Sequence, residues 1–271
     1  MPLSIEGRPD KTRAIATIHA ALDAGITFID TADAYTLDAD GPGHNELLIA
    51  DALASYPGDT SKVLVASKGG LVHRDGNESW DRVGTVEHIL QAARDSRARL
   101  GVESIGLYQH HAPDPKVDYR ESVTAIRDLL DDGVIRMAGI SNVSIAQIEI
   151  AQEVLDGRLV SVQNQLSPGV RDSLPVLEYC AKHELAFLPW SPLGGIGNGK
   201  EVFASRHVFT EVAEELAVSP QQVALAWELA LEHVVIPIPG STRPESITDS
   251  ARAADLVLTA EQLQRLSADA A

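Results

Sequence analysis

The stretch GITFIDTADAY, residues 25–35, changes character at its middle. Its first half, residues 26–29, is apolar apart from one β-branched threonine, and it reads as a short buried strand. Gly25, just before it, is the usual signal for the end of a helix. The second half places Asp30 at the strand's end and Tyr35 five residues later. A buried strand that ends in an acid and a phenol indicates a functional site at its carboxyl end.

The order of helix, glycine and apolar run repeats along the chain. Strands are expected at 27–30, 63–67, 104–110, 135–141, 159–163, 186–190 and 234–239. Helices are expected at 11–24, 44–56, 84–100, 119–132, 144–156, 172–183, 206–232 with a break near Pro220, and 243–253. This alternation is typical of an α/β protein with a parallel sheet.

The first expected helix, 11–24, has no strand before it. Seven strand–helix pairs and one additional helix favour a (β/α)8 TIM barrel over a doubly wound sheet. The first strand of that barrel is expected to be missing or reduced to residues 1–5. Because no linker, repeat or low-complexity tract divides the chain, residues 1–271 are expected to form a single domain.

Composition narrows the classes of partner. The chain has 271 residues, of which 44% are hydrophobic, and a net charge of −17, which disfavours nucleic acid and anionic membranes as partners. No apolar run is long enough for a membrane span, and the start lacks the layout of a signal peptide, so a cytoplasmic protein is expected. The single cysteine, Cys180, excludes an intrachain disulfide and is expected to be a buried core residue.

Polar residues gather where the expected strands end, which is where barrels of this type carry their active residues. They are Asp30, Tyr35, Lys68, His110, His111, Ser141, Asn142, Gln163, Asn164, Trp190, Ser191, Gly240, Ser241, Thr242 and Arg243. Successive residues of a strand point to opposite faces, so only one of the two adjacent histidines is expected to face inward.

An acid, a lysine and a tyrosine on neighbouring strands form a coherent relay. Asp30 would hold Lys68 in its charged form, and the lysine charge would lower the pKa of Tyr35 toward neutrality, so that the phenol acts as a general acid. A histidine beside them would orient a carbonyl oxygen. Such a site suits protonation of an oxygen while hydride arrives at carbon. No side chain supplies hydride, so a nicotinamide cofactor is implied.

Eight motifs follow one another in a recognisable order. They are DTADAY (30–35), GHNE (43–46), SKGG (67–70), RLGVESIGLYQHHAPDP (99–115), DGVIRMAGISN (132–142), VQNQLS (162–167), WSPLGG (190–195) and IPIPGSTRPESI (236–247). Over residues 11–258 the chain resembles the aldo-keto reductase superfamily. The resemblance implies a catalytic tetrad of Asp30, Tyr35, Lys68 and His111, and it leaves His110 as the outward neighbour.

The same resemblance assigns a cofactor site. Ser141, Asn142 and Gln163 match residues that bind the nicotinamide carboxamide, and Trp190 matches the aromatic ring that stacks on the nicotinamide. The pyrophosphate loop corresponds to Ser191, Leu193 and Gly195, and the 2′-phosphate clamp to Ser241, Thr242 and Arg243. Gly240, just before the clamp, is also expected to bind the cofactor. Asp249 stands near the family's adenine contacts. An arginine grips phosphate in a forked fashion, so NADPH is expected in preference to NADH.

The chain also departs from the family pattern. The usual N-terminal hairpin and first strand are expected to be absent, because Met1 falls where that strand should end. The loop after the fourth strand is short, which indicates a small aldehyde or ketone as substrate and a resemblance to bacterial pyridoxal-reductase-like members. Trp80 is expected to line the substrate pocket.

Alternative functions are a nicotinamide-binding redox-sensing regulator and an inactive truncated reductase. A metal-dependent hydrolase built on the two adjacent histidines is disfavoured by strand geometry, and no metal is expected.

Overall fold

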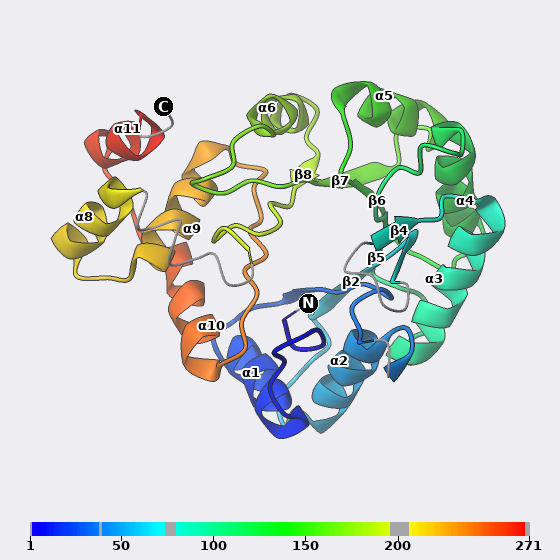
Figure 1. Ribbon diagram of the computed structural model, residues 1–271, viewed down its shortest axis with the longest axis horizontal. Coiled ribbons are helices and arrows are strands. Elements are labelled where there is room, and N and C mark those ends of the chain that lie inside the picture. The colour runs from blue at the N-terminus through cyan, green and yellow to red at the C-terminus, as the bar shows by residue number, and fades with distance from the viewer. Residues whose placement is uncertain (1, 38–39, 74–79, 196–205, 269–271) are drawn as a thin grey trace.

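The computed structural model describes residues 2–37, 40–73, 80–195 and 206–268. Its main sheet has six parallel strands in the order β1-β2-β5-β6-β7-β8. They are β1 (Phe28–Asp30), β2 (Leu64–Gly69), β5 (Leu107–His110), β6 (Ala138–Ser141), β7 (Leu159–Gln163) and β8 (Ala186–Phe187). Figure 1 shows this sheet curling inside a ring of helices, as in the predicted barrel.

Helices follow the strands on the outside of the ring (Figure 1). They are α1 (Lys11–Asp23), α2 (His44–Ser55), α3 (Val86–Leu100), α4 (Tyr119–Asp131), α5 (Ile145–Val154), α6 (Leu174–Lys182), α8 (His207–Leu216), α9 (Pro220–Leu231), α10 (Pro244–Ala251) and α11 (Ala260–Ala268), with a 3₁₀ turn η2 (Arg252–Asp255) after α10. Most of these helices fall where the sequence predicted them, including the break at Pro220. In the described part of the chain, none is long and apolar enough to cross a membrane.

Local sequence sets the helix ends. The side chain of Asp10 accepts the Arg13 N–H at the start of α1, and Thr85 does the same for His88 at the start of α3. Gly101 ends α3 in the left-handed region with φ 66°. The apolar faces of these helices pack on the outer side of the sheet, where residues such as Ile89, Tyr108, Ile126, Ile140 and Ile148 are fully buried.

The register of the strands decides which side chains face inward. Phe28 pairs with Leu64 and Asp30 with Ala66 across β1 and β2, while Lys68 pairs with Gln109 across β2 and β5. Because side chains alternate along a strand, Lys68 and Gln109 point into the barrel and their neighbours Ser67 and Tyr108 point toward the helices. Charged and amide groups therefore meet inside the sheet.

The prediction of a strand at 234–239 is wrong over most of that range. The segment makes one parallel bridge, Phe187↔Val235, and two backbone hydrogen bonds with Phe187. Pro237 and Pro239 have no N–H to donate, so the ladder cannot continue. At the opposite edge, residues 2–7 form turns, and no strand within the described ranges pairs with the free edge of β1. Residues 2–7 therefore do not add a strand to the sheet as the structure describes it.

Two further features were not predicted. An antiparallel hairpin of β3 (Leu71–His73) and β4 (Trp80–Arg82) follows β2. Helix α11 lies near the C-terminus, where Arg171 donates to the carbonyls of Leu266 and Ser267 and stacks over the Trp227 ring at 4.6 Å. The hairpin extends the wall of the barrel mouth, whereas α11 lies against the outer helices α8 and α9 (Figure 1).

Candidate active site

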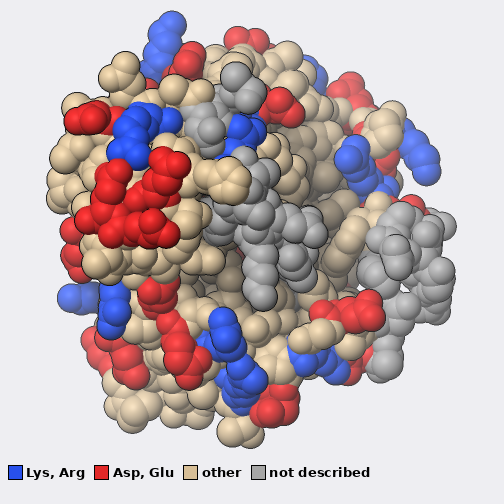
Figure 2. All heavy atoms as spheres, turned by 60° about the vertical axis from the view of Figure 1, so that its left-hand side comes forward, with Lys and Arg blue, Asp and Glu red and all other residues tan. Residues whose placement is uncertain are grey.

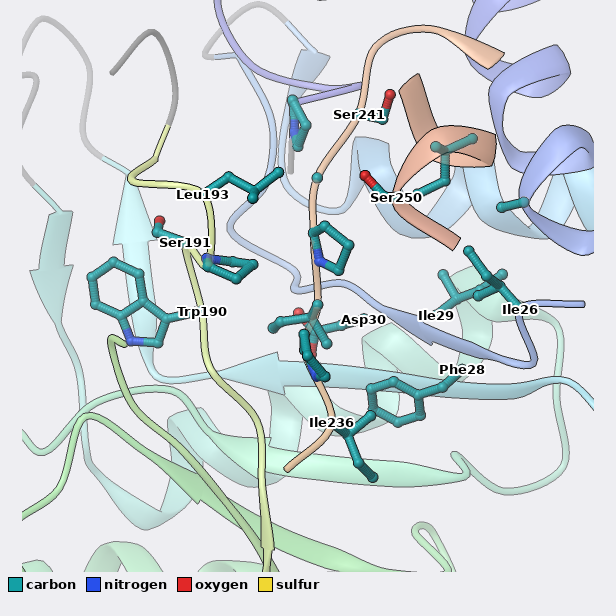
Figure 3. A pocket seen from close by; sticks show the side chains of 18 of the residues that line it. Ile26, Phe28, Ile29, Asp30, Trp190, Ser191, Leu193, Ile236, Ser241 and Ser250 are labelled. Atoms are coloured by element: carbon teal, nitrogen blue, oxygen red, sulfur yellow. The ribbon is translucent and has the colours of Figure 1, made fainter. Parts of the chain in front are cut away.

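One cavity of about 940 Å³ runs from the carboxyl ends of the strands along the edge of β1. Its wall includes Asp30, Tyr35, Trp80, His111, Ser141, Asn142, Gln163, Trp190, Ser191, Leu193, Gly195, Gly240, Ser241 and Thr242. Figure 3 shows Trp190, Ser191 and Leu193 on one side and Ser241 and Ser250 on the other, with Asp30 between them. Most of the site residues expected from the sequence therefore lie around a single space. Lys68, Arg243 and Asp249 do not line it.

Lys68 is fully buried beneath this cavity. Its ammonium donates to Asp30 Oδ2 at 2.6 Å and to the carbonyl of Thr31 at 2.8 Å. Burial acts to lower the pKa of Lys68, but the charge of Asp30 and the neighbouring Tyr35 outweigh burial, and the pKa is raised. The lysine is therefore a cation throughout the physiological range.

Asp30 connects this cation to the amide side chains of the barrel. Its Oδ1 accepts from Gln163 Nε2 at 2.9 Å and from Gln109 Nε2 at 3.3 Å. Lys68 occupies the other oxygen, so both carboxylate oxygens have donors. The buried charge is thus paired and hydrogen-bonded, which is the condition for keeping an ion pair in a protein interior.

Tyr35 stands above the lysine in the loop after β1. The ammonium nitrogen of Lys68 lies 5.2 Å from the centroid of its ring. The rings of His111 and Trp80 meet it edge-on, at centroid distances of 5.7 Å and 6.4 Å. A phenol, an imidazole and an indole thus enclose one end of the cavity.

The expected lowering of the Tyr35 pKa is wrong in direction. Burial raises the pKa of this phenol above its ordinary value of 10, the Lys68 charge opposes the rise, and Asp30 adds to it. The Asp30 carboxylate, which keeps Lys68 charged, also offsets part of the effect of the Lys68 charge on the pKa of Tyr35. Tyr35 therefore carries its proton at neutral pH.

The two adjacent histidines separate as the strand geometry predicted. His111 lines the cavity, and its pKa is held well below 6.5 by burial, with the charges of Lys68 and His110 acting in the same direction. His110 packs on the outer side at 5.7 Å from the Tyr119 ring, and burial lowers its pKa to about 4. Both imidazoles are neutral at physiological pH, and only His111 can meet a bound molecule.

Ser141, Asn142 and Gln163 form a connected polar group at the ends of β6 and β7. The Ser141 hydroxyl donates to the Gln163 carbonyl at 2.7 Å, and Asn142 Nδ2 donates to the His111 carbonyl at 2.9 Å. The indole N–H of Trp190 donates to Asn142 Oδ1 at 3.1 Å. Asn164 does not line the cavity. Its side chain instead accepts the Val143 N–H and donates to the Val143 carbonyl.

Two loops form the far wall of the cavity. After Trp190 the chain turns through positive φ at Ser191, Gly194 and Gly195, with values of 53°, 91° and 92°. Opposite it, the Ser241 hydroxyl donates to the Arg243 carbonyl at 2.8 Å just before α10 begins. The Arg243 side chain at the N-cap of α10 makes no capping hydrogen bond, so this helix end is open to an anion.

Two of the expected cofactor residues are placed differently. Arg243 is exposed, and within the described ranges its side chain makes no hydrogen bond or ion pair. Asp249 lies inside α10, where its carboxylate accepts from Ser219 Oγ at 2.5 Å and Gln222 Nε2 at 2.6 Å. Its oxygens thus join α10 to the start of α9.

The sequence reading missed the apolar part of the wall. Phe28, Ile29 and the segment 236–239 line the cavity, whereas the sequence pattern predicts them as strand interior. No signal in the sequence distinguishes a cavity wall from a packed strand, since both are apolar runs. Trp80, in β4, does line the cavity as expected.

Comparison with known proteins identifies the family. The family model described as the aldo/keto reductase family matches residues 2–269. An uncharacterised oxidoreductase of Schizosaccharomyces pombe is 35% identical over 257 residues, which cover 95% of this chain and 79% of the relative. A 6-dehydroglucose reductase of Novosphingobium aromaticivorans is 32% identical over 89% of this chain and 80% of its own length.

Solved structures agree in fold. A glycerol dehydrogenase of Gluconobacter oxydans superposes with a TM-score of 0.82 at 30% identity, covering 97% of this chain and 86% of that one. An aldo/keto reductase of Klebsiella pneumoniae, solved in complex with NADP and acetate, has a TM-score of 0.81 at 23% identity, covering 98% of this chain and 88% of that one. The chain therefore belongs to the aldo/keto reductase family and is an NAD(P)H-dependent oxidoreductase.

Proposed function

We propose that the protein catalyses the reversible, NADPH-dependent reduction of a small aldehyde or ketone to an alcohol, with Tyr35 as the general acid. The observation that carries this proposal is the grouping of four side chains at one end of the cavity: a protonated phenol, a buried ammonium, its carboxylate and a neutral imidazole. These are Tyr35, Lys68, Asp30 and His111.

The cavity fits a nicotinamide dinucleotide in size and in the order of its polar groups. Its volume of about 940 Å³ is in the range of cofactor sites. Ser141, Asn142 and Gln163 would hold the carboxamide, and the face of Trp190 would support the ring. The turn from Ser191 to Gly195 would follow the pyrophosphate. When bound, the cofactor supplies the hydride that no side chain can supply.

The open end of α10 supports the preference for NADPH. Gly240, Ser241 and Thr242 line the cavity beside uncapped N–H groups, and the exposed Arg243 guanidinium is free to pair with a phosphate. These surroundings favour the negatively charged 2′-phosphate of NADPH over the plain 2′-hydroxyl of NADH. The carboxylate of Asp249, held by its own partners, is assigned only an indirect part through the position of α10.

Proton transfer follows from the charges around Tyr35. A carbonyl oxygen at this end of the cavity meets a phenol that still holds its proton, because the pKa of Tyr35 is raised by burial. Once the proton has left, the phenolate is stabilised by the permanent cation of Lys68 beneath it. The neutral His111 orients the carbonyl oxygen without competing for the proton.

The substrate is proposed to be small. Trp80 stands edge-on to Tyr35 and forms the outer wall of the cavity at the end where the reaction would occur. We propose that the protein is a bacterial, pyridoxal-reductase-like member of the family with short loops. The relatives named as a 6-dehydroglucose reductase and a glycerol dehydrogenase are both named for small polar compounds. A small hydroxylated aldehyde is therefore the first substrate class to test.

The chain is further proposed to work as one domain, residues 1–271, in the cytoplasm and without a nucleic-acid partner. The family match over residues 2–269 supports one domain. The buried free Cys180 suits a reducing compartment. A net charge of −17 repels phosphate backbones, and Figure 2 shows adjacent Asp and Glu side chains gathered on one face.

A second candidate is a reductase limited by an open barrel. In the described ranges nothing pairs with the outer edge of β1, and the cavity runs along that edge beside Phe28 and Ile236. An unpaired edge of this kind favours association between chains and loosens the floor of the site.

The experiment is an assay of NADPH oxidation against a panel of small aldehydes and ketones, repeated with a chelator, together with fluorescence titration of NADPH. Turnover that survives chelation supports the reductase. Tight NADPH binding without turnover across the panel would instead favour a redox-sensing regulator. Weak binding with no turnover would favour the open, inactive barrel.

A further inference from the structure

Tyr35 lies in the segment of residues 31–37 after β1, which is held in place through the backbone of Asp33. The Asp33 N–H donates to the Lys68 carbonyl at 3.2 Å, and its carbonyl accepts from the Gly43 N–H at 2.7 Å. Two residues on, the Tyr35 carbonyl accepts from the Asn45 N–H at 3.2 Å. Asp33 thus joins β2 to the start of α2, and the phenol is placed by this connection.

The carboxyl group of Asp33 lies in an unusual environment. The residue is 7% exposed, and its Oδ1 is buried without a hydrogen-bond partner in the described part of the chain. The nearest cations are already paired with other acids. Arg99 donates through Nε to Glu46 Oε2 at 2.6 Å and through Nη2 to Ser96 at 3.3 Å, and the Ser67 hydroxyl donates to the other oxygen of Glu46.

The charged groups around the Asp33 carboxyl are already paired with one another, so an ionised Asp33 would add an unpaired negative charge. On α2, Glu46 is fully buried and pairs with Arg99 of α3. On β2, the ammonium of Lys68 belongs to Asp30. Tyr108 of β5 adds a buried hydroxyl with no partner. A second carboxylate would therefore enter a sealed space that holds one acid and one base already paired.

We propose that Asp33 is a positioning residue for Tyr35 that works as a neutral, protonated acid, and that losing its proton in alkaline solution loosens residues 31–37. An ionised Asp33 needs water or a donor at Oδ1, which is buried without a partner in the described part of the chain, so residues 31–37 must shift to supply one. Tyr35, two residues away, then leaves its place above Lys68. The kinetic half of this inference rests on the proposed role of Tyr35, whereas the structural half does not.

The electrostatics agree with this geometry. Burial, and then the charge of Glu46, raise the pKa of Asp33 from 3.8 to about 8, against the opposing effects of Arg99, the Ala34 N–H and Lys68. The pKa of Tyr35 is raised above 10. As pH rises, Asp33 therefore ionises before Tyr35.

The first test measures unfolding against pH for the wild type and Asp33→Asn. A raised folded-state pKa means that stability is fully present below pH 4 and is lost as pH rises toward 8. Relative to D33N, the unfolding equilibrium constant of the wild type should rise by about tenfold per pH unit between these limits. Parallel curves for the two proteins would overturn the inference, whether or not the protein reduces carbonyls.

Two variants guard against a trivial result. Asp114→Asn is the matched control, because the Asp114 carboxyl is also buried but accepts the N–H groups of Gly84 and Lys116, and its pKa is lowered. Relative to D114N, the wild type should lose stability as pH falls through the acid range, and the two proteins should keep the same slope near pH 8. Glu46→Gln removes the charge that disfavours a second carboxylate, so the slope should end at a lower pH. A slope that stays in place in E46Q would contradict the shared environment.

The second test measures kcat against pH. The wild type should lose kcat by about tenfold per pH unit above pH 8, with a smaller change in KM for the cofactor. D33N should keep its activity until Tyr35 itself ionises, whereas Asp33→Ala, which also removes volume, should be impaired at every pH. An alkaline limb that stays at the same pH in D33N would exclude Asp33 as its origin. No turnover in any protein, with the stability difference intact, would count against the proposed reaction and leave the role of Asp33 in the fold standing.

Discussion

Two buried ion pairs flank the first two strands, and they differ in what else they touch. Inside the barrel, Lys68 and Asp30 meet at 2.6 Å; outside it, Arg99 and Glu46 meet at the same distance. The inner cation lies beneath a cavity and below the ring of Tyr35. The outer pair lies between the sheet and helices α2 and α3, where Ser67 donates to the remaining acid oxygen.

The two ion pairs differ in the group that lies beside them. That group decides whether the pair can take part in catalysis. Near the inner pair, a phenol that faces a bound molecule can lose its proton and be stabilised by the cation. The group beside the outer pair is the buried carboxyl of Asp33, which does not face a bound molecule. The same interaction is therefore proposed to be catalytic on one face of the sheet and structural on the other.

The largest expected effect comes from breaking the inner pair. Lys68→Met leaves Asp30 buried without its cation and removes the charge that stabilises the Tyr35 phenolate. We expect kcat to fall by about 10²–10⁴-fold and the free energy of unfolding by about 3–5 kcal/mol. Steady-state kinetics and denaturant unfolding measure both. The exposed Lys62→Met is the control, and a K68M enzyme that matches it in rate would remove Lys68 from the mechanism.

Breaking the outer pair should separate stability from catalysis. Arg99→Met leaves the Glu46 carboxylate buried without a cation, at an expected cost of about 3–5 kcal/mol, reduced by the partial exposure of the arginine. The surface pair of Arg94 and Asp132, at 3.8 Å, provides the control Arg94→Met, with an expected cost below about 1 kcal/mol. Denaturant unfolding compares them. An R99M enzyme that is fully stable but inactive would reverse the proposed division between the two faces.

The smallest expected effect concerns a charge that belongs to neither pair. Arg243→Ala should weaken NADPH binding by about ten- to a hundredfold, since a charge-assisted contact to phosphate contributes about 1.5–3 kcal/mol. NADH binding should change little. Fluorescence titration of both cofactors measures the difference, with Arg252→Ala at the other end of α10 as the control. Equal losses for the two cofactors would show that Arg243 only supports the helix start.

Much of the fold could be predicted because strands and helices have different apolar periods. The barrel, the break at Pro220 and the separation of His110 from His111 all follow from local sequence. The predicted strand at 234–239 is longer than the observed pairing, because the prediction rests on the apolar residues and the two prolines there interrupt the ladder. The β3–β4 hairpin was missed because its strands are only three residues long.

The site was harder to predict where burial decides the chemistry. Asp30, Tyr35 and Lys68 could be grouped from their places at strand ends, but the direction of the Tyr35 pKa depends on how deeply the phenol is packed. Asp33 was passed over for the same reason. In the sequence it is one polar residue in a loop, and only the structure shows that its Oδ1 is buried without a partner in the described ranges while the nearby cations pair with other acids. The roles of these residues remain predictions.

The most direct test of the inner site is Tyr35→Phe, measured for NADPH binding and for carbonyl reduction in the same preparation. The ring and its contacts with His111 and Trp80 are kept, and only the proton donor is removed. We predict NADPH affinity within a few-fold of the wild type and turnover reduced by about 10²–10⁴-fold. Turnover close to the wild-type rate would show that the proton comes from another group and would contradict the role of Tyr35.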